Sequence, residues 1–91
     1  MVETVDLLFY SRPDCHLCDE MKEVVENVLA GVERVPITLK LIDVSADPEL
    51  EREYGMDVPL LFYGDECIAK HRIAGEELLK RIAKLTRFIH E

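Results

Sequence analysis

Residues 5–20 read VDLLFYSRPDCHLCDE, and this stretch decides the fold. Its beginning, Val5–Tyr10, is a short apolar run that is typical of a buried strand. Residues 11–14 contain a proline between polar side chains, which predicts a loop. Two cysteines, Cys15 and Cys18, follow directly. The sequence therefore predicts a strand that leads, through one loop, into a helix that begins with a CxxC motif.

This first helix is predicted over residues 15–30. Apolar side chains recur at helical spacing on one face, while charged and amide side chains fill the other face. Asp14 is the expected N-cap, and Gly31 is the expected stop just past the end. The apolar positions are Leu17, Met21, Val24, Val25, Val28, Leu29 and Val32.

The rest of the chain adds a short helix, three strands and a second long helix. A proline just inside a helix start, with a glycine after its end, predicts the short helix. Alternating or continuous apolar residues predict strands, and a Gly-Asp-Glu connection predicts that the last two strands form a hairpin. The expected elements are strand 37–44, helix 48–54 ended by Gly55, strands 59–63 and 68–73 joined by residues 64–66, and a helix from Gly75 with apolar positions Leu78, Leu79, Ile82, Leu85, Phe88 and Ile89.

The resulting order, β-α-β-α-β-β-α, predicts an α/β fold. Strand–helix–strand at the start implies a parallel pair with a right-handed crossover, and the hairpin adds antiparallel strands. We therefore expect a four-stranded mixed sheet with helices on both faces. The 91 residues fit one domain, residues 1–91, without a linker, an internal repeat or a low-complexity tract.

The chain is acidic, with 19 Asp and Glu against 11 Lys and Arg and a net charge of −8. Such a surface repels phosphate backbones and anionic lipid, so we expect neither a nucleic-acid nor a membrane partner. The first residues carry acids where a secretory peptide carries Lys or Arg, and no run approaches the ~18 apolar residues of a membrane span. Three cysteines are too few for the disulfide framework of a small secreted domain. We therefore expect a cytoplasmic protein, and we expect it to be a monomer.

Cys15 and Cys18 carry the expected chemistry. Two intervening residues on a first helical turn let the sulfurs approach bonding distance. Free amide groups and the positive end of the helix dipole favour a thiolate at Cys15. Cys15 would attack a target disulfide, and Cys18 would resolve the mixed intermediate. His16 adds a possible cation that would favour this thiolate. Three nearby carboxylates disfavour a second negative charge at Cys15, namely Asp14, Asp19 and Glu20.

A metal site is the main alternative use of the CxxC motif. Zinc needs four ligands, and the chain has no second CxxC or spaced histidine pair. The remaining candidates, His16, Cys67, His71 and His90, lack zinc-finger spacing, so we predict no metal ligands. A zinc ion or iron–sulfur cluster shared between two chains stays an alternative, as in a metal carrier. Cys67 is expected to be a small residue at a strand start, and His71 a strand-face residue.

Three features together resemble the thioredoxin superfold, and its compact glutaredoxin-like branch in particular. They are the element order, the CxxC motif, and the sequence Asp57-Val58-Pro59 ahead of a strand. The similarity extends from about residue 5 to residue 88. In that family the proline corresponding to Pro59 follows a cis peptide bond and lies beside the active-site sulfurs. A cis peptide bond costs much less energy before proline than before any other residue.

The resemblance implies a small thiol–disulfide oxidoreductase with catalytic Cys15 and Cys18. The backbone before the proline would pair with an extended thiol substrate, as an added strand does. Its partners would be protein or small-molecule thiols and disulfides. It would bind no cofactor, and its reductant would be glutathione or a dithiol reductase. The alternative within this fold is a non-catalytic adaptor that binds a partner along the proline groove. The implied substrate-binding residues are Arg12, His16, Val58 and Pro59.

The chain departs from the family pattern at two places. Glutaredoxins commonly carry Pro-Tyr between the cysteines, where this chain has His16-Leu17, and the nearest upstream cation is Arg12. The family's Gly-Gly-x-Asp, which holds glutathione at a helix start, is replaced by residues 74–77, Ala-Gly-Glu-Glu. Two acids at this helix start suit the helix dipole but would repel a glutathione carboxylate.

Overall fold

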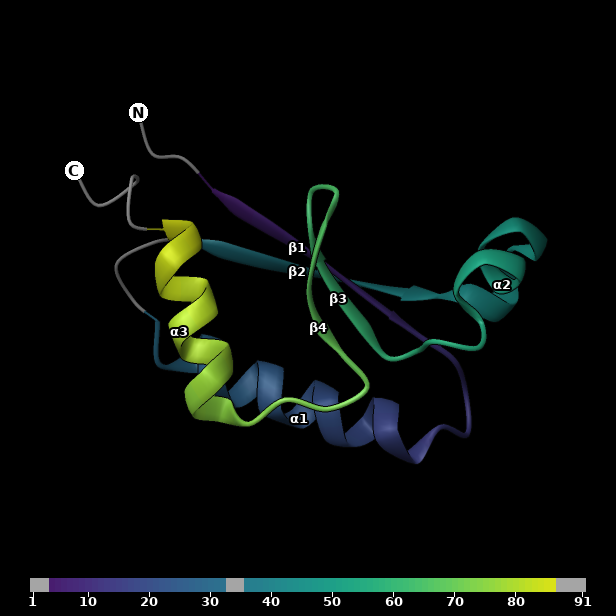
Figure 1. Ribbon diagram of the computed structural model, residues 1–91, viewed down its shortest axis with the longest axis horizontal. Helices are drawn as coiled ribbons and strands as arrows, with labels where there is room; N and C mark the ends of the chain where they lie inside the picture. The colour runs from purple at the N-terminus through teal and green to yellow at the C-terminus, as the bar shows by residue number, and fades with distance from the viewer. Residues whose placement is uncertain (1–3, 33–35, 87–91) are drawn as a thin grey trace.

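A computed structural model describes residues 4–32 and 36–86 and contains a four-stranded mixed sheet (Figure 1). The strands lie in the order β2-β1-β3-β4. The central strand β1 (Val5–Ser11) is parallel to β2 (Ile37–Asp43) and antiparallel to β3 (Leu60–Tyr63). The last strand, β4 (Glu66–Lys70), is antiparallel to β3. The predicted α/β fold with a mixed sheet is confirmed.

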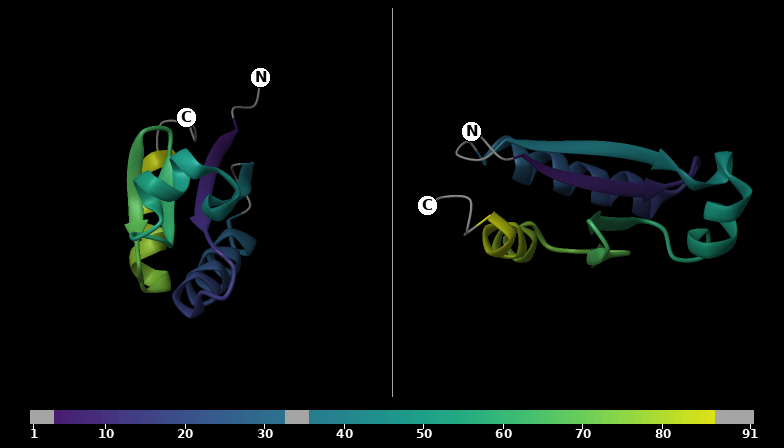
Figure 2. Two further views of the ribbon diagram at one scale, coloured as in Figure 1. Left: turned by 90° about the vertical axis from the view of Figure 1, so that its right-hand side faces the viewer. Right: turned by 90° about the horizontal axis from the view of Figure 1, so that it is seen from above.

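The helices are distributed unequally about the sheet, whereas the sequence predicted helices on both faces. Helices α1 (His16–Ala30) and α3 (Gly75–Thr86) share one face and contact each other. The short helices η1 (Val44–Ala46) and α2 (Pro48–Tyr54) lie at one end of the sheet (Figures 1 and 2). Within residues 4–32 and 36–86, no helix is long and apolar enough to cross a membrane.

Helix α2 reaches the other face of the sheet through one aromatic side chain. The ring of Tyr54 stacks on that of Tyr10, with centroids 4.8 Å apart, and meets Phe62 edge-on at 5.8 Å. Such ring pairs stabilise a fold beyond the area that they bury. Asp47 caps this helix, since its carboxylate accepts the Glu49 N–H at 2.9 Å. The predicted start and end of α2 are therefore confirmed.

The main core lies between the sheet and the pair α1 and α3. Alternate residues of β1 point into it, because successive strand side chains face opposite sides. Residues one helical turn apart do the same on each helix. A second, smaller cluster lies beside the two cysteines and contains Cys18, Val44 and Val58. The buried members of the main core are Val5, Leu7, Phe9, Met21, Val25, Leu61, Ile68, Ala69, Leu78 and Ile82.

The last strand differs from its prediction at both ends. It begins at Glu66 rather than residue 68, because Glu66 already pairs with Tyr63 across the hairpin. It ends at Lys70 rather than residue 73, because the chain leaves the sheet at His71, whose φ is +64°. His71 is therefore an exposed residue beyond the strand and not a strand-face residue.

Two leucines, one in the predicted strand 37–44 and one on the apolar face of the predicted last helix, are half exposed. Leu41 is 50% exposed, because β2 is an edge strand with a neighbour on one side only. Leu79 is also 50% exposed, because it follows the buried Leu78 directly and adjacent helical residues point in different directions. Phe88 and Ile89, predicted in the last helix, lie outside the described residues.

Candidate active site

Cys15 lies where the loop after β1 enters α1, and its sulfur caps the helix. The Cys15 backbone is extended, with φ −117° and ψ 106°, and its Sγ accepts the Cys18 N–H at 3.1 Å. The predicted cap, Asp14, was wrong. It has a left-handed φ of 56°, which aspartate tolerates, and it lies one residue too early. The positive end of α1 is therefore directed at the Cys15 sulfur, which favours a thiolate.

The two cysteines are joined by a disulfide, with their Cα atoms 5.2 Å apart. That separation lies within the usual range for disulfides. The two residues differ in exposure: Cys18 is only 3% exposed, whereas Cys15 is half-buried. One sulfur is thus accessible to a partner while the other lies behind it.

The Val58–Pro59 segment borders this cysteine pair. Its peptide bond is cis, and Val58 packs in one apolar cluster with Cys18. Pro59 is buried, and its carbonyl accepts the His71 N–H at 2.9 Å. Among the described residues, no hydrogen bond uses the backbone N–H or C=O of Val58. A backbone donor and acceptor are therefore free beside the disulfide.

Arg12 lies in the same loop as the cysteines, but its guanidinium is engaged by a carboxylate. Its Nη2 donates to Oε1 of Glu51 in α2. The other carboxylate oxygen, Oε2, is buried without a hydrogen-bond partner. The ion pair therefore ties the cysteine loop to α2, and a substrate anion at Arg12 would compete with Glu51.

The rim of the cysteine pair carries several exposed charges. His16 is the first residue of α1 and is exposed. Asp57, next to Val58, is ion-paired with Lys70 at 3.5 Å. The exposed acids Asp14, Asp19 and Glu20 make no ion pair with the part of the chain that the structure describes. The rim therefore presents free carboxylates near the accessible sulfur.

The other metal-ligating and thiol side chains do not join this site. Across residues 4–32 and 36–86, no group of three or more His, Cys, Asp or Glu side chains could hold a metal ion. Cys67 is a free cysteine near the start of β4, as expected, but it is exposed. Its thiol donates to the Ala69 carbonyl at 3.4 Å.

Comparison with known proteins assigns the chain to a family. Residues 6–83 match the sequence model of the family described as glutaredoxin-like domain (DUF836). The chain belongs to this family. A search of curated proteins found no match. A glutaredoxin-like domain that carries the Cys15–Cys18 pair fits a redox function.

Solved structures share the fold of this glutaredoxin-like domain. Protein XcR50 from X. campestris, solved by X-ray, is 26% identical with a TM-score of 0.69, covering 86% of this chain and 96% of that one. Thioredoxin-2 of a malaria parasite is 20% identical with a TM-score of 0.66, covering 92% and 85%. A mutant thioredoxin from Halobacterium salinarum is 27% identical with a TM-score of 0.53, covering 96% and 75%. The predicted thioredoxin-like fold is confirmed.

Two contacts in this glutaredoxin-like domain were not predicted from sequence. They are the Arg12–Glu51 ion pair and the hydrogen bond from the His71 N–H to the Pro59 carbonyl. The first joins residues 39 positions apart, and no local pattern marks either partner. Arg12, His16, Val58 and Pro59 remain predictions as substrate-binding residues.

Proposed function

We propose that this domain is a small thiol–disulfide oxidoreductase, in which Cys15 attacks and Cys18 resolves. The observation that carries the proposal is the asymmetry of the pair. The Cys15 sulfur is accessible and accepts a backbone N–H at the start of α1, whereas Cys18 is buried behind it. This is the environment in which a cysteine becomes a reactive thiolate.

The reaction runs in two exchange steps. In the reduced protein, the Cys15 thiolate attacks one sulfur of a substrate disulfide, forms a mixed disulfide and releases the first substrate thiolate. Cys18 then loses its proton and attacks Cys15 Sγ, which forms the intramolecular disulfide and releases the second thiolate. The substrate disulfide gains two electrons; of the two protons that the released thiolates take up, one comes from Cys18 and the other from solvent. Glutathione or a dithiol reductase would return the Cys15–Cys18 disulfide to the dithiol.

The free backbone of Val58 would align the substrate. An extended segment around the substrate cysteine can donate to the Val58 C=O and accept from its N–H, as an added strand does. The hydrogen bond from His71 to Pro59 steadies this segment from the other side. The same backbone would hold a protein or a small peptide thiol, so the proposal covers both kinds of partner.

The first test is a redox titration. The protein is equilibrated in buffers of defined ratios of reduced to oxidised glutathione, and its thiols are alkylated and located by mass spectrometry. We expect Cys15 and Cys18 to be protected together as the buffer becomes more oxidising, in the wild type and equally in Cys67→Ser. A protein that forms no Cys15–Cys18 disulfide at any ratio would contradict the dithiol mechanism.

The second test separates the roles of the two cysteines. Cys18→Ser removes the resolving sulfur, so mixed disulfides on Cys15 should accumulate and can be isolated with their partners. Cys15→Ser removes the nucleophile and should abolish disulfide reduction. Accumulation on Cys18 in the Cys15→Ser variant would reverse the proposed roles. Partner binding that survives Cys15→Ser, in a protein without turnover, would favour the adaptor alternative.

A further inference from the structure

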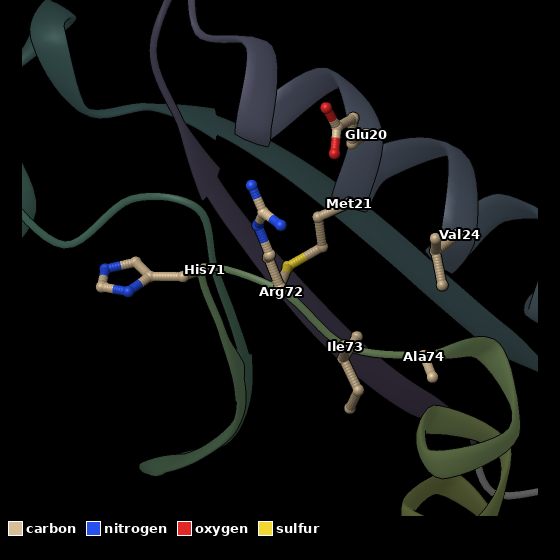
Figure 3. Close-up of a pocket in the computed structure, with 7 residues that line it drawn as sticks. All are labelled: Glu20, Met21, Val24, His71, Arg72, Ile73 and Ala74. Carbon is tan, nitrogen blue, oxygen red and sulfur yellow. The ribbon is translucent and has the colours of Figure 1, made fainter.

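A hollow opens between α1 and the segment that joins β4 to α3 (Figure 3). Its volume is about 410 Å³, which is within the range of ligand pockets, ~300–1,000 Å³. Helix α1 contributes Glu20, Met21 and Val24 to its lining, and the joining segment contributes residues 71–74. The mechanism proposed above does not use this hollow.

The hollow begins next to the cysteine pair. Met21 follows Cys18 by one turn on the same face of α1, and both are nearly fully buried. On the other side, the N–H of His71 donates to the carbonyl of Pro59, which fixes the joining segment beside the cis-proline. His71 holds a left-handed φ of 64° there, a conformation uncommon for residues other than glycine.

The distance from the cysteines suits a polypeptide. Met21, which lines the hollow, lies six residues beyond the attacking Cys15, which is about 9 Å along the helix axis. An extended chain covers that distance with about three residues. A polypeptide that pairs with Val58 and runs along α1 therefore places a side chain in the hollow within about three residues of its reacting cysteine.

The lining of the hollow is apolar at one end and ionic at the other. Val24 and Ala74 lie at one end, and Glu20 and Arg72 lie at the end nearer the start of α1 (Figure 3). Neither Glu20 nor Arg72 forms an ion pair within the described ranges, and their opposite charges balance. The His71 imidazole points away from the hollow (Figure 3). At the apolar end a charged group would lose its hydration without gaining a partner, whereas an apolar side chain would not, because Glu20 and Arg72 lie at the opposite end.

We propose that this hollow is a subsite for one large apolar side chain of a polypeptide disulfide. The inference rests on the proposed function and narrows its substrate class. The favoured substrate carries leucine, methionine or phenylalanine within about three residues of its reacting cysteine. Glutathione, whose other residues are glutamate and glycine, has no large apolar side chain for the hollow. The hollow therefore discriminates between polypeptide and glutathione disulfides.

The experiment compares three substrates on three proteins. Two synthetic peptide disulfides differ only in leucine or glycine two residues from the cysteine, and the third substrate is oxidised glutathione. Ala74→Phe fills the hollow, and Ala30→Phe places the same substitution on the exposed far end of α1 as a control. If Ala74→Phe does not fold, Ala74→Asp charges the lining with little added bulk and serves the same comparison.

We expect the wild type to reduce the leucine peptide with a kcat/KM about tenfold above that of the glycine peptide, as for one aliphatic group in an apolar pocket. Ala74→Phe should bring this ratio near one, while Ala30→Phe preserves it. Equal rates for both peptides with the wild type would overturn the subsite, as would a ratio that survives both Ala74 variants. No reduction of any of the three disulfides would overturn the proposed function itself.

Discussion

At the residue scale, the sulfur of Cys15 has two roles in one place. It accepts the Cys18 N–H, a position that Ser, Thr, Asp or Asn usually occupies, and it is the more accessible half of the disulfide. A thiolate is a stronger acceptor than a thiol, so the cap is strongest when the sulfur is charged. The start of α1 thereby stabilises the thiolate form of Cys15, which is the form that the proposed mechanism requires.

The Arg12–Glu51 ion pair leads to a prediction at the same scale. The two side chains are 34% and 42% exposed, and exposed pairs contribute about 0–1 kcal/mol. The partnerless Oε2 of Glu51 offsets part of that gain. We expect Glu51→Gln to lower the free energy of unfolding in urea by less than about 1 kcal/mol. A substantially larger loss would show that the pair is a major support of the cysteine loop.

At the element scale, the ends of helices and strands are determined by particular residues. Asp47 begins α2 and Gly55 ends it, and a Cβ at Gly55 would clash with the Glu51 carbonyl oxygen. The β3–β4 hairpin turns at Gly64, whose φ is +59°. Gly55 is therefore required by a close contact, whereas Gly64 is required by its backbone conformation.

A substitution at Gly64 measures the free-energy cost of the left-handed backbone conformation by itself. A Cβ there would meet nothing within 4 Å, so a change in stability reflects φ alone. We expect Gly64→Ala to lower the free energy of unfolding by about 1–2 kcal/mol, and Gly64→Asn by less, because asparagine visits the left-handed region more readily. Denaturant unfolding of both variants measures the difference. Equal losses for alanine and asparagine would rule out the backbone explanation.

At the scale of the whole molecule, one small core supports the sheet and two helices. A chain of this length is expected to have a free energy of unfolding of about 5–14 kcal/mol. The fully buried residues of the main core include Leu61 on β3, which contacts the layer formed by α1 and α3. A single large cavity there would remove a substantial share of the total stability.

We expect Leu61→Ala to lower the free energy of unfolding by about 2–5 kcal/mol, because it leaves a cavity that the sheet cannot close. Leu79→Ala is the matched control: Leu79 is half exposed, so its truncation should change stability by less than about 1 kcal/mol. Thermal and denaturant unfolding of the two variants provide the comparison. Similar losses for both leucines would contradict the assigned core.

The sequence alone determined the elements, the mixed sheet and the dithiol. Each of these can be predicted from short-range sequence patterns. Apolar residues at a spacing of two or at helical spacing mark the buried faces of strands and helices, and Asp47-Pro48 marks the start of α2. The CxxC motif and the Val58–Pro59 pair are also visible as short strings. The Asp14 cap failed because Cys15 supplies the same hydrogen bond one residue later.

The tertiary structure decided what surrounds the dithiol. The Arg12–Glu51 pair, the His71–Pro59 hydrogen bond and the hollow each join segments that are distant along the chain. The exposure of Leu41 and Leu79 likewise depends on which neighbours each element has. Local patterns specify the apolar face of an element, but the packing of distant segments specifies which part of that face is covered.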